Sequence, residues 1–250
     1  NAARTSLMQT ELVKTCELTA ADRAAMHTLL SCHFDGVTPA VFETDLSLKN
    51  WVLLLKDGCD LKGFSTLLMY DIPFEGEILT IVYSGDTIMD PSAWSSPVLS
   101  RAWVAAVNGL RSHYQGDRLY WLLISSGFRT YRFLPTFWQT FYPRHNQPTP
   151  AWHQRLMQFL CHRQFGEWYD KAAGIVRFPA AQQLRSHLGG IPTERLRNPH
   201  VKFFNQRNPG HAQGDELVCL TEIAIENLTA AGRRMWFGET SLVTGKPLDS

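Results

Sequence analysis

Residues 50–114 read NWVLLLKDGCDLKGFSTLLMYDIPFEGEILTIVYSGDTIMDPSAWSSPVLSRAWVAAVNGLRSHY. Apolar and β-branched residues fill three runs of this stretch, at 50–57, 61–74 and 78–89, and that composition is typical of β-strands. Asp57-Gly58 separates the first two runs, and Glu75-Gly76-Glu77 separates the second from the third. The stretch therefore predicts three consecutive strands joined by tight turns, with the second strand broken near Pro73.

A single amphipathic helix is predicted after the third strand. Asp90-Pro91-Ser92 should end the strand and start the helix, because proline is tolerated in a first turn and serine caps free amides. Apolar residues then recur at helical spacing as Val98, Trp103, Ala106, Val107 and Leu110. Gly85 predicts a bulge inside the third strand, since glycine in a strand usually accompanies a bulge or a close backbone approach.

Further elements are expected on both sides of this stretch. A strand over 12–18 precedes a helix that Thr19 and Asp22 open as a capping pair, and a second helix covers 39–48. A buried strand over 118–124 is followed by a strand-to-helix turn at 125–127 and an aromatic segment over 128–141. Beyond them we expect a helix over 151–170, irregular chain over 172–214, a strand over 216–223 and a helix over 226–235.

Composition sets broad limits. A chain of 250 residues without an apolar run of about 18 residues fits a globular protein with no membrane span. The five cysteines are scattered, with no Cys-x-x-Cys pair, and residues 1–10 lack a signal pattern. We therefore expect a reducing, cytoplasmic location.

Charge is unevenly distributed along the chain. Residues 1–110 carry 7 Lys and Arg against 13 Asp and Glu, whereas residues 111–207 carry 14 against 4. The basic middle could be a solvated face that balances the acidic first part, or it could bind a polyanionic cofactor. Nucleic acid is a less favoured partner, because the aromatic and arginine residues of 128–133 belong to no known nucleic-acid motif.

The order of strand, two helices, three strands, helix, strand and helix resembles the GNAT-type N-acyltransferase fold over residues 10–145. That resemblance implies an α/β fold with a mixed, mostly antiparallel sheet flanked by helices. Met89-Asp90-Pro91 matches the Val-x-Pro-like step that ends the family's fourth strand. The glycine-rich loop that should follow is absent, because the sequence continues as 92–99, SAWSSPVL. Residues 146–250 have no counterpart in a minimal domain, and could complete the sheet, cover an acceptor site or form a homodimer contact.

The resemblance also implies a site. Acetyl-CoA or another acyl-CoA would lie where the fourth and fifth strands separate, near Met89 and Leu122. Helix amides and small hydroxyls can bind its phosphates without glycine, so the expected cofactor-binding residues are Met89, Trp94, Ser95, Ser96, Ser125, Arg129 and Arg132.

Proton transfer in this family usually involves a carboxylate on the fourth strand and a tyrosine near the fourth helix. Asp86 and Tyr131 match those positions, and Tyr83 and Ser84 are further candidates. Each main candidate has a structural alternative: Asp86 could cap a turn, and Tyr131 could pack with its hydroxyl on a backbone partner.

The sequence therefore predicts an acyltransferase that acts on a small amine. The main alternative is a catalytically degenerate member of the fold that binds a ligand or protein, and a nucleic-acid-binding module is a third. Metal and hydrolase sites are not expected, because no His-Glu-x-x-His or Gly-x-Ser-x-Gly occurs.

Overall fold

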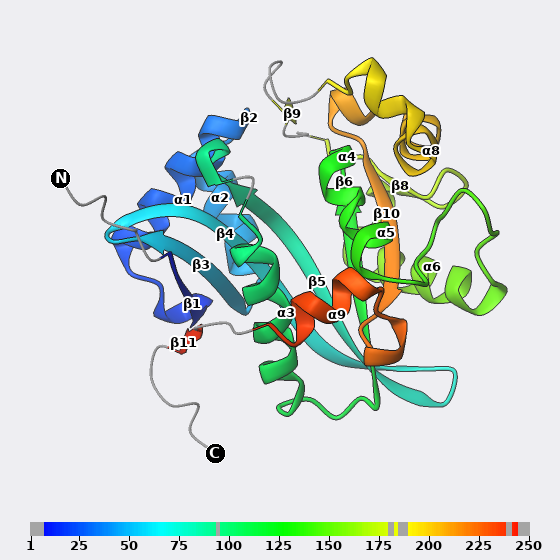
Figure 1. Cartoon of the computed structure of the whole chain (residues 1–250), viewed down its shortest axis with the longest axis horizontal. Helices are drawn as coiled ribbons and strands as arrows, with labels where there is room; N and C mark the ends of the chain where they lie inside the picture. Colours follow the sequence, from blue (N-terminus) through cyan, green and yellow to red (C-terminus); the bar gives the residue numbers. More distant parts are fainter. Residues whose placement is uncertain (1–7, 94–95, 180–182, 185–189, 239–241, 245–250) are drawn as a thin grey trace.

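The computed structural model describes residues 8–93, 96–179, 183–184, 190–238 and 242–244. The described strands form a nine-stranded sheet in the order β11-β1-β3-β4-β5-β6-β10-β8-β7, and β2 and β9 form a separate pair. Two pairs in the large sheet, β1 with β11 and β5 with β6, are parallel, and its other pairs are antiparallel. The predicted mixed, mostly antiparallel α/β sheet is confirmed (Figure 1).

The strands of the large sheet are β1 (Gln9–Lys14), β3 (Trp51–Asp57), β4 (Asp60–Phe74), β5 (Glu77–Met89), β6 (Arg118–Ser125), β7 (Tyr169–Asp170), β8 (Ile175–Val176), β10 (Glu216–Glu222) and β11 (Leu242–Thr244). The small pair is β2 (Phe34–Asp35) and β9 (Gln183–Leu184). The helices are α1 (Ala20–His33), α2 (Pro39–Ser47), α3 (Val98–Arg111), α4 (Phe128–Tyr131), α5 (Phe133–Phe137), α6 (Ala151–Phe165), α8 (Pro199–Arg207) and α9 (Ala230–Trp236).

Both predicted hairpin turns are present. Gly58 has a φ of 61°, and Glu75 and Gly76 have φ values of 47° and 86°. The predicted break at Pro73 is wrong, because β4 continues to Phe74 and Pro73 pairs with Ile78. β3 pairs with β4 only as far as Leu67, so Pro73 lies in the part of β4 beyond that ladder, where its missing N–H is tolerated.

The helix after β5 starts later than the sequence predicts. Residues Pro91–Ala93 form a short 3-10 turn, η2, and α3 begins only at Val98. The Asp90 carboxylate accepts a hydrogen bond of 2.9 Å from the Ser92 amide, which closes this turn. Pro97 then disfavours a helical conformation at the residue before it, so the helix cannot run through this step.

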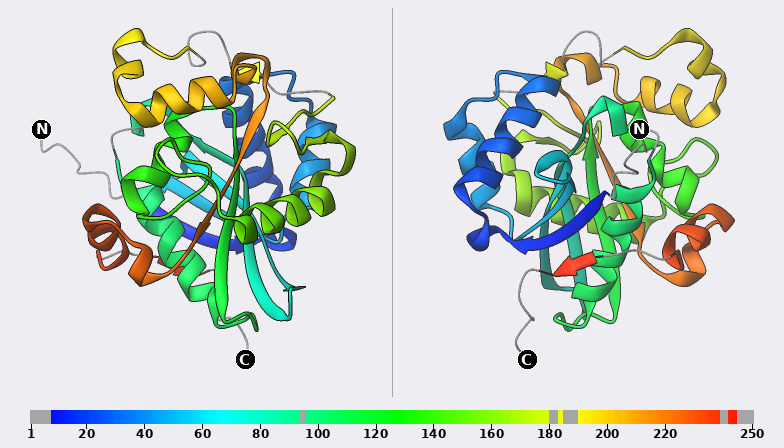
Figure 2. Two further views of the ribbon diagram at one scale, coloured as in Figure 1. Left: turned by 90° about the vertical axis from the view of Figure 1, so that its right-hand side faces the viewer. Right: turned by 60° about the vertical axis from the view of Figure 1, so that its left-hand side comes forward.

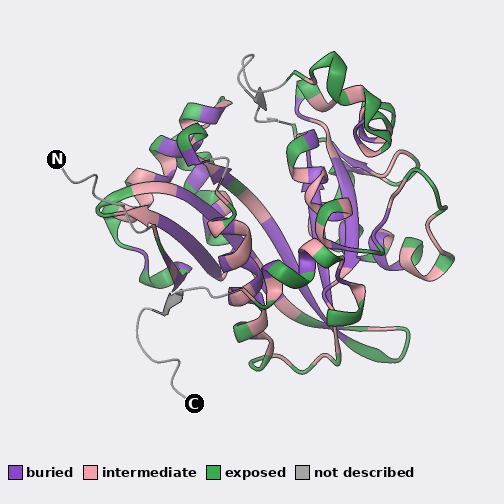
Figure 3. Ribbon diagram, viewed as in Figure 1, coloured by how far each residue is buried: buried purple, intermediate pink, exposed green. Residues whose placement is uncertain are grey.

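Helices cover both faces of the sheet, as the two views in Figure 2 show. Alternate residues of each strand enter different cores: Leu53 and Leu55 pack with α3, whereas Val52 and Leu54 pack with α1 and α2. On β6 the same alternation sends Tyr120 toward α6. We call the side covered by α1, α2 and α6 the first face, and the side covered by α3, α4, α5, α8 and α9 the second face. The central strands are largely buried between them (Figure 3).

Residues 146–250 add strands at both edges of the sheet. β10 pairs with β6, and β11 pairs with β1. The segment 172–214, expected to be irregular, contains α8, which begins after Asn198 caps the amides of His200 and Val201. None of the helices in the described ranges combines the length and apolar character needed to cross a membrane.

Candidate functional site

The sheet divides between β5 and β6. These parallel strands pair from Leu79 with Arg118 to Ser84 with Leu123, and there the ladder stops although β5 continues to Met89. In Figure 1 the two strands diverge beyond this point. Within the described chain, β5 therefore presents a strand edge that β6 does not cover.

A bulge lies where the strands begin to separate. Leu67 of β4 faces Ser84, but Ser65 faces Thr87, so Thr66 lies opposite both Gly85 and Asp86. This confirms the bulge predicted at Gly85. The extra residue shifts the alternation of β5 and brings Asp86 onto the first face, where Tyr83 also lies.

The neighbours of Gly85 leave no room for a side chain at this position. A Cβ atom at this position would lie 2.6 Å from Cε of Lys49 and 2.8 Å from Oγ1 of Thr66. The Thr66 hydroxyl is buried and has no hydrogen-bond partner among the described residues. The bulge is thus packed directly against a buried cation and an unpaired hydroxyl.

Carboxylates gather on the first face of this bulge. Burial, followed by repulsion from Asp45, raises the pKa of Asp86 to about 7. Burial, followed by repulsion from Asp86 and Asp45, raises the pKa of Glu216, at the start of β10, to about 8. Carboxyl groups with such values exchange protons near neutral pH, as a general base must.

Lys49 is the cation of this group. Its side chain is 1% exposed, and its Nζ lies 3.0 Å from the Asp45 carboxylate and 5.5 Å from the centre of the Tyr83 ring. Its charge lowers the pKa of Asp86 and of Glu216, opposing the effect of burial. We call Asp45, Lys49, Tyr83, Asp86 and Glu216 the acid cluster.

The two candidate tyrosines lie on different faces. Burial, together with the charges of Glu216, Asp45 and Asp86, raises the pKa of Tyr83 and keeps its hydroxyl protonated. Tyr131 is fully buried on the second face, and its hydroxyl donates a hydrogen bond of 2.9 Å to the Pro143 carbonyl. This hydrogen bond matches the structural alternative for Tyr131, in which the ring packs and its hydroxyl binds a backbone partner. Tyr131 is not in contact with the acid cluster.

The predicted cofactor residues lie mainly toward the second face or at strand ends. The Met89 carbonyl lies 2.9 Å from Nε2 of His33. Ser96 accepts a hydrogen bond from the Val98 amide at the start of α3, and Ser125 accepts one from the Gly127 amide before α4. Trp94 and Ser95 lie outside the described residues.

Arg129 and Arg132 bring positive charge to the start of the segment after β6. The Arg129 guanidinium lies 5.0 Å from the centre of the Phe128 ring, and its side chain is exposed. Arg132 is half-buried. The second face therefore has cations and helix starts suited to phosphates, although Val98 already uses its amide on Ser96.

No family model matches the sequence, and no curated protein matches it. Solved structures with related folds include a probable N-acyltransferase from Enterococcus faecalis, with 14% identity and a TM-score of 0.40. That match covers 53% of this chain and 33% of the other. An acyl-CoA N-acyltransferase from Pseudomonas aeruginosa gives 16% identity, a TM-score of 0.36 and coverage of 46% and 79%. A GNAT-family N-acetyltransferase from Escherichia coli in complex with CoA gives 15% identity and a TM-score of 0.38, and the match covers 53% of this chain and 71% of the other.

At such low similarity the fold follows from the strand order of this chain and from the parallel β5–β6 ladder that ends at Ser84. The arrangement is GNAT-like.

Three members of the acid cluster were not predicted from the sequence: Glu216, Asp45 and Lys49. Glu216, Val218 and Leu220 are alternate residues of β10 and so lie on the same side of the strand. Val218 and Leu220 pack in the core on the first face. A charged residue at an inward position of a predicted strand is the signal that could have found it. Asp45 lies in the last turn of α2 and Lys49 just after its end. Their spacing of four residues is common on helix surfaces, so only the tertiary fold shows that they reach the bulge.

Proposed function

We propose that this chain transfers an acyl group from acyl-CoA to a small amine, with Asp86 as the general base. The observation that carries the proposal is the raised pKa of Asp86 at a bulge where β5 leaves β6. An amine can attack a thioester only after it loses a proton, and a carboxylate that titrates near pH 7 is suited to accept that proton.

The proposed reaction assigns a role to each side of the site. The acyl-CoA would lie along the uncovered edge of β5, with its phosphates toward Arg129 and Arg132. The amine proton passes to Asp86, the new C–N bond forms, and the C–S bond breaks. CoA leaves as a thiolate and takes a proton from Tyr83, which yields an amide and free CoA. Tyr131 could donate this proton instead only after releasing the Pro143 carbonyl.

Calorimetric titration with acetyl-CoA and with a longer acyl-CoA tests the first requirement. Thiol release with a panel of primary amines then tests turnover. We expect Asp86→Asn to lower turnover by about a hundredfold or more without weakening acyl-CoA binding. Asp60→Asn, at the exposed first residue of β4, is the matched control.

A paired comparison separates the two tyrosines. Tyr83→Phe should slow thiol release, whereas Tyr131→Phe should alter stability and leave the catalytic rate constant nearly unchanged. The reverse result would transfer the acid role to Tyr131. Activity retained in Asp86→Asn would refute the general base.

A second candidate function is a GNAT-fold binding module without catalysis. It is favoured by the loop before α3, which has no glycine over 92–97 and in which Ser96 occupies the Val98 amide. This candidate predicts ligand or protein binding with no thiol release from any acyl-CoA. Acyl-CoA binding followed by turnover would exclude it.

A further inference from the structure

A polar pocket lies at the opposite end of β6 from the acid cluster. Its volume is about 360 Å³, and its lining includes Arg118, Tyr142, His153, Glu222 and Glu226. Arg118 is the first residue of β6, and Ser125, at the divergence from β5, is the last. At about 3.3 Å per residue these ends are roughly 23 Å apart. The pocket is therefore separate from the proposed acyl-transfer site, and we call it the β6-start pocket.

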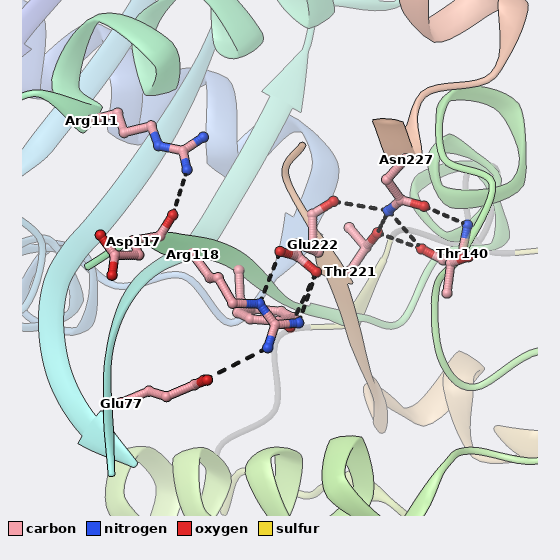
Figure 4. Close-up of polar contacts among 9 residues, drawn as sticks. Glu77, Arg111, Asp117, Arg118, Thr140, Thr221, Glu222 and Asn227 are labelled. Carbon is pink, nitrogen blue, oxygen red and sulfur yellow. Dashed lines mark hydrogen bonds and ion pairs between the residues drawn. The ribbon is translucent and has the colours of Figure 1, made fainter. Parts of the chain in front are cut away.

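The arginine of this pocket is already bound on every side. Nε and Nη2 donate hydrogen bonds of 3.0 and 2.9 Å to the Glu222 carboxylate, and Nη1 lies 3.7 Å from Glu77 (Figure 4). The guanidinium carbon lies 5.1 Å from the centre of the Tyr120 ring and 5.0 Å from that of Trp152. An anion would have to displace these partners, so Arg118 is not a free anion-binding group.

The net charge of the ionised side chains at this pocket is negative. Glu77 and Glu222 together outweigh Arg118 by one charge, and Glu226 adds another. Glu226 is exposed and makes neither an ion pair nor a hydrogen bond within the part of the chain that the structure describes. A bidentate Arg–Glu pair beside a free carboxylate leaves a site that attracts positive charge.

Neutral acceptors complete the lining. Burial, followed by the charge of Arg118, lowers the pKa of His153, so its ring is neutral at pH 7 and one ring nitrogen is an acceptor. The His153 ring lies 4.8 Å from that of Tyr142 and 5.1 Å from that of Trp152, measured between centroids. Among the described residues no three His, Cys, Asp or Glu side chains are grouped as metal ligands, so the cation is not expected to be a bound metal ion.

We propose that the β6-start pocket binds a small organic cation of the primary amine class. The ammonium group has three donors and no acceptor, which matches a lining whose unused groups are a carboxylate, an imidazole and hydroxyls. The alkyl part would pack against Tyr142 and Ala224. A pocket of this volume holds a molecule of the size of a short diamine.

Two tryptophans allow the site to be located by NMR of ¹⁵N-labelled indoles. Trp152 adjoins the β6-start pocket, whereas the indole of Trp121 donates a 2.8 Å hydrogen bond to Ser84, where the β5–β6 ladder ends. Trp152→Phe and Trp121→Phe assign the two signals. Titration with n-butylamine, with putrescine and with n-butanol then separates charge from alkyl size.

We expect both amines to shift the Trp152 indole signal and n-butanol to leave it unchanged. Glu226→Gln should weaken this response by about tenfold or more, as loss of a charge-assisted contact predicts. Glu194→Gln removes an exposed glutamate from the first turn of another 3-10 helix and should have no effect.

An equal response to n-butanol, no response to either amine, or a full response in Glu226→Gln would overturn the proposal. Asp86→Asn separates this site from the acyl-transfer site. That variant should alter the amine response of Trp121 and leave the response of Trp152 unchanged, so that failure of either proposal can be recognised alone.

Discussion

At the residue scale, Asp86 links the chemistry of the bulge to the stability of the fold. Its pKa is about 3.8 in an unfolded chain and is raised in the folded protein. Above pH 4 the unfolded state releases this proton while the folded state retains it. Folding therefore loses free energy as the pH rises from about 4 to 7, because the native carboxyl must ionise in a buried and already negative setting.

Asp86→Asn should consequently stabilise the protein at pH 8, by about 1–2 kcal/mol once relaxation of Glu216 and Lys49 is allowed for. The gain should disappear below about pH 3, where wild-type Asp86 is protonated in both states. Urea unfolding at both pH values measures the difference. A variant that is equally or less stable at pH 8 would show that the folded pKa is not raised.

Lys49 sets the protonation of the same cluster. Its removal by Lys49→Met should raise the pKa of Asp86 and Glu216, since its charge favours their ionised forms. The inflection of turnover against pH should move to higher pH by roughly one unit, with the plateau rate little changed. Lys62→Met, on β4, is a control that should leave the inflection in place. A fall in rate at every pH without a shift would instead indicate a purely structural role for Lys49.

At the scale of elements, the bulge of β5 depends on the absence of a side chain at Gly85. Gly85→Ala would press a methyl group onto Lys49 and Thr66, both buried. We expect a loss of about 1–3 kcal/mol of stability and reduced turnover. Gly109→Ala, in α3, has nothing within 4 Å of its new Cβ and should be neutral or stabilising through helix propensity. Thermal unfolding of both variants tests the contrast.

Local signals predicted most of the elements around this bulge. Thr19 and Asp22 form the expected capping box, and the glycines at 58 and 76 have the expected positive φ. The start of α3 was predicted wrongly, because the proline at 97 acts on the residue before it and overrides the capping signal at 91–92. The acid cluster was predicted only at Asp86 and Tyr83. Its other carboxylates come from α2 and β10, and their proximity depends on tertiary pairing that no local pattern contains.

At the scale of the whole molecule, the last hundred residues are structurally joined to the GNAT-like part. β10 pairs with β6 along six residue positions, from Leu217 with Ser125 to Glu222 with Tyr120. A fragment of residues 1–145 would leave the edge of β6 without this partner and would lack Glu216. We expect it to show no cooperative thermal transition, whereas the full chain shows one. A cooperative transition in the fragment would establish the first 145 residues as an independent folding unit.

The parallel pairing of β1 with β11 has a consequence for synthesis. Leu12 pairs with Thr244, so β1 is synthesised long before the strand that pairs with its outer edge. During translation, β1 has no partner at its outer edge until β11 is made, and β6 lacks its partner until β10 is made. The nascent chain thus carries two open strand edges until β10 and β11 have been made, and protection by a chaperone during that interval would matter more for this protein than for one whose sheet closes in sequence order.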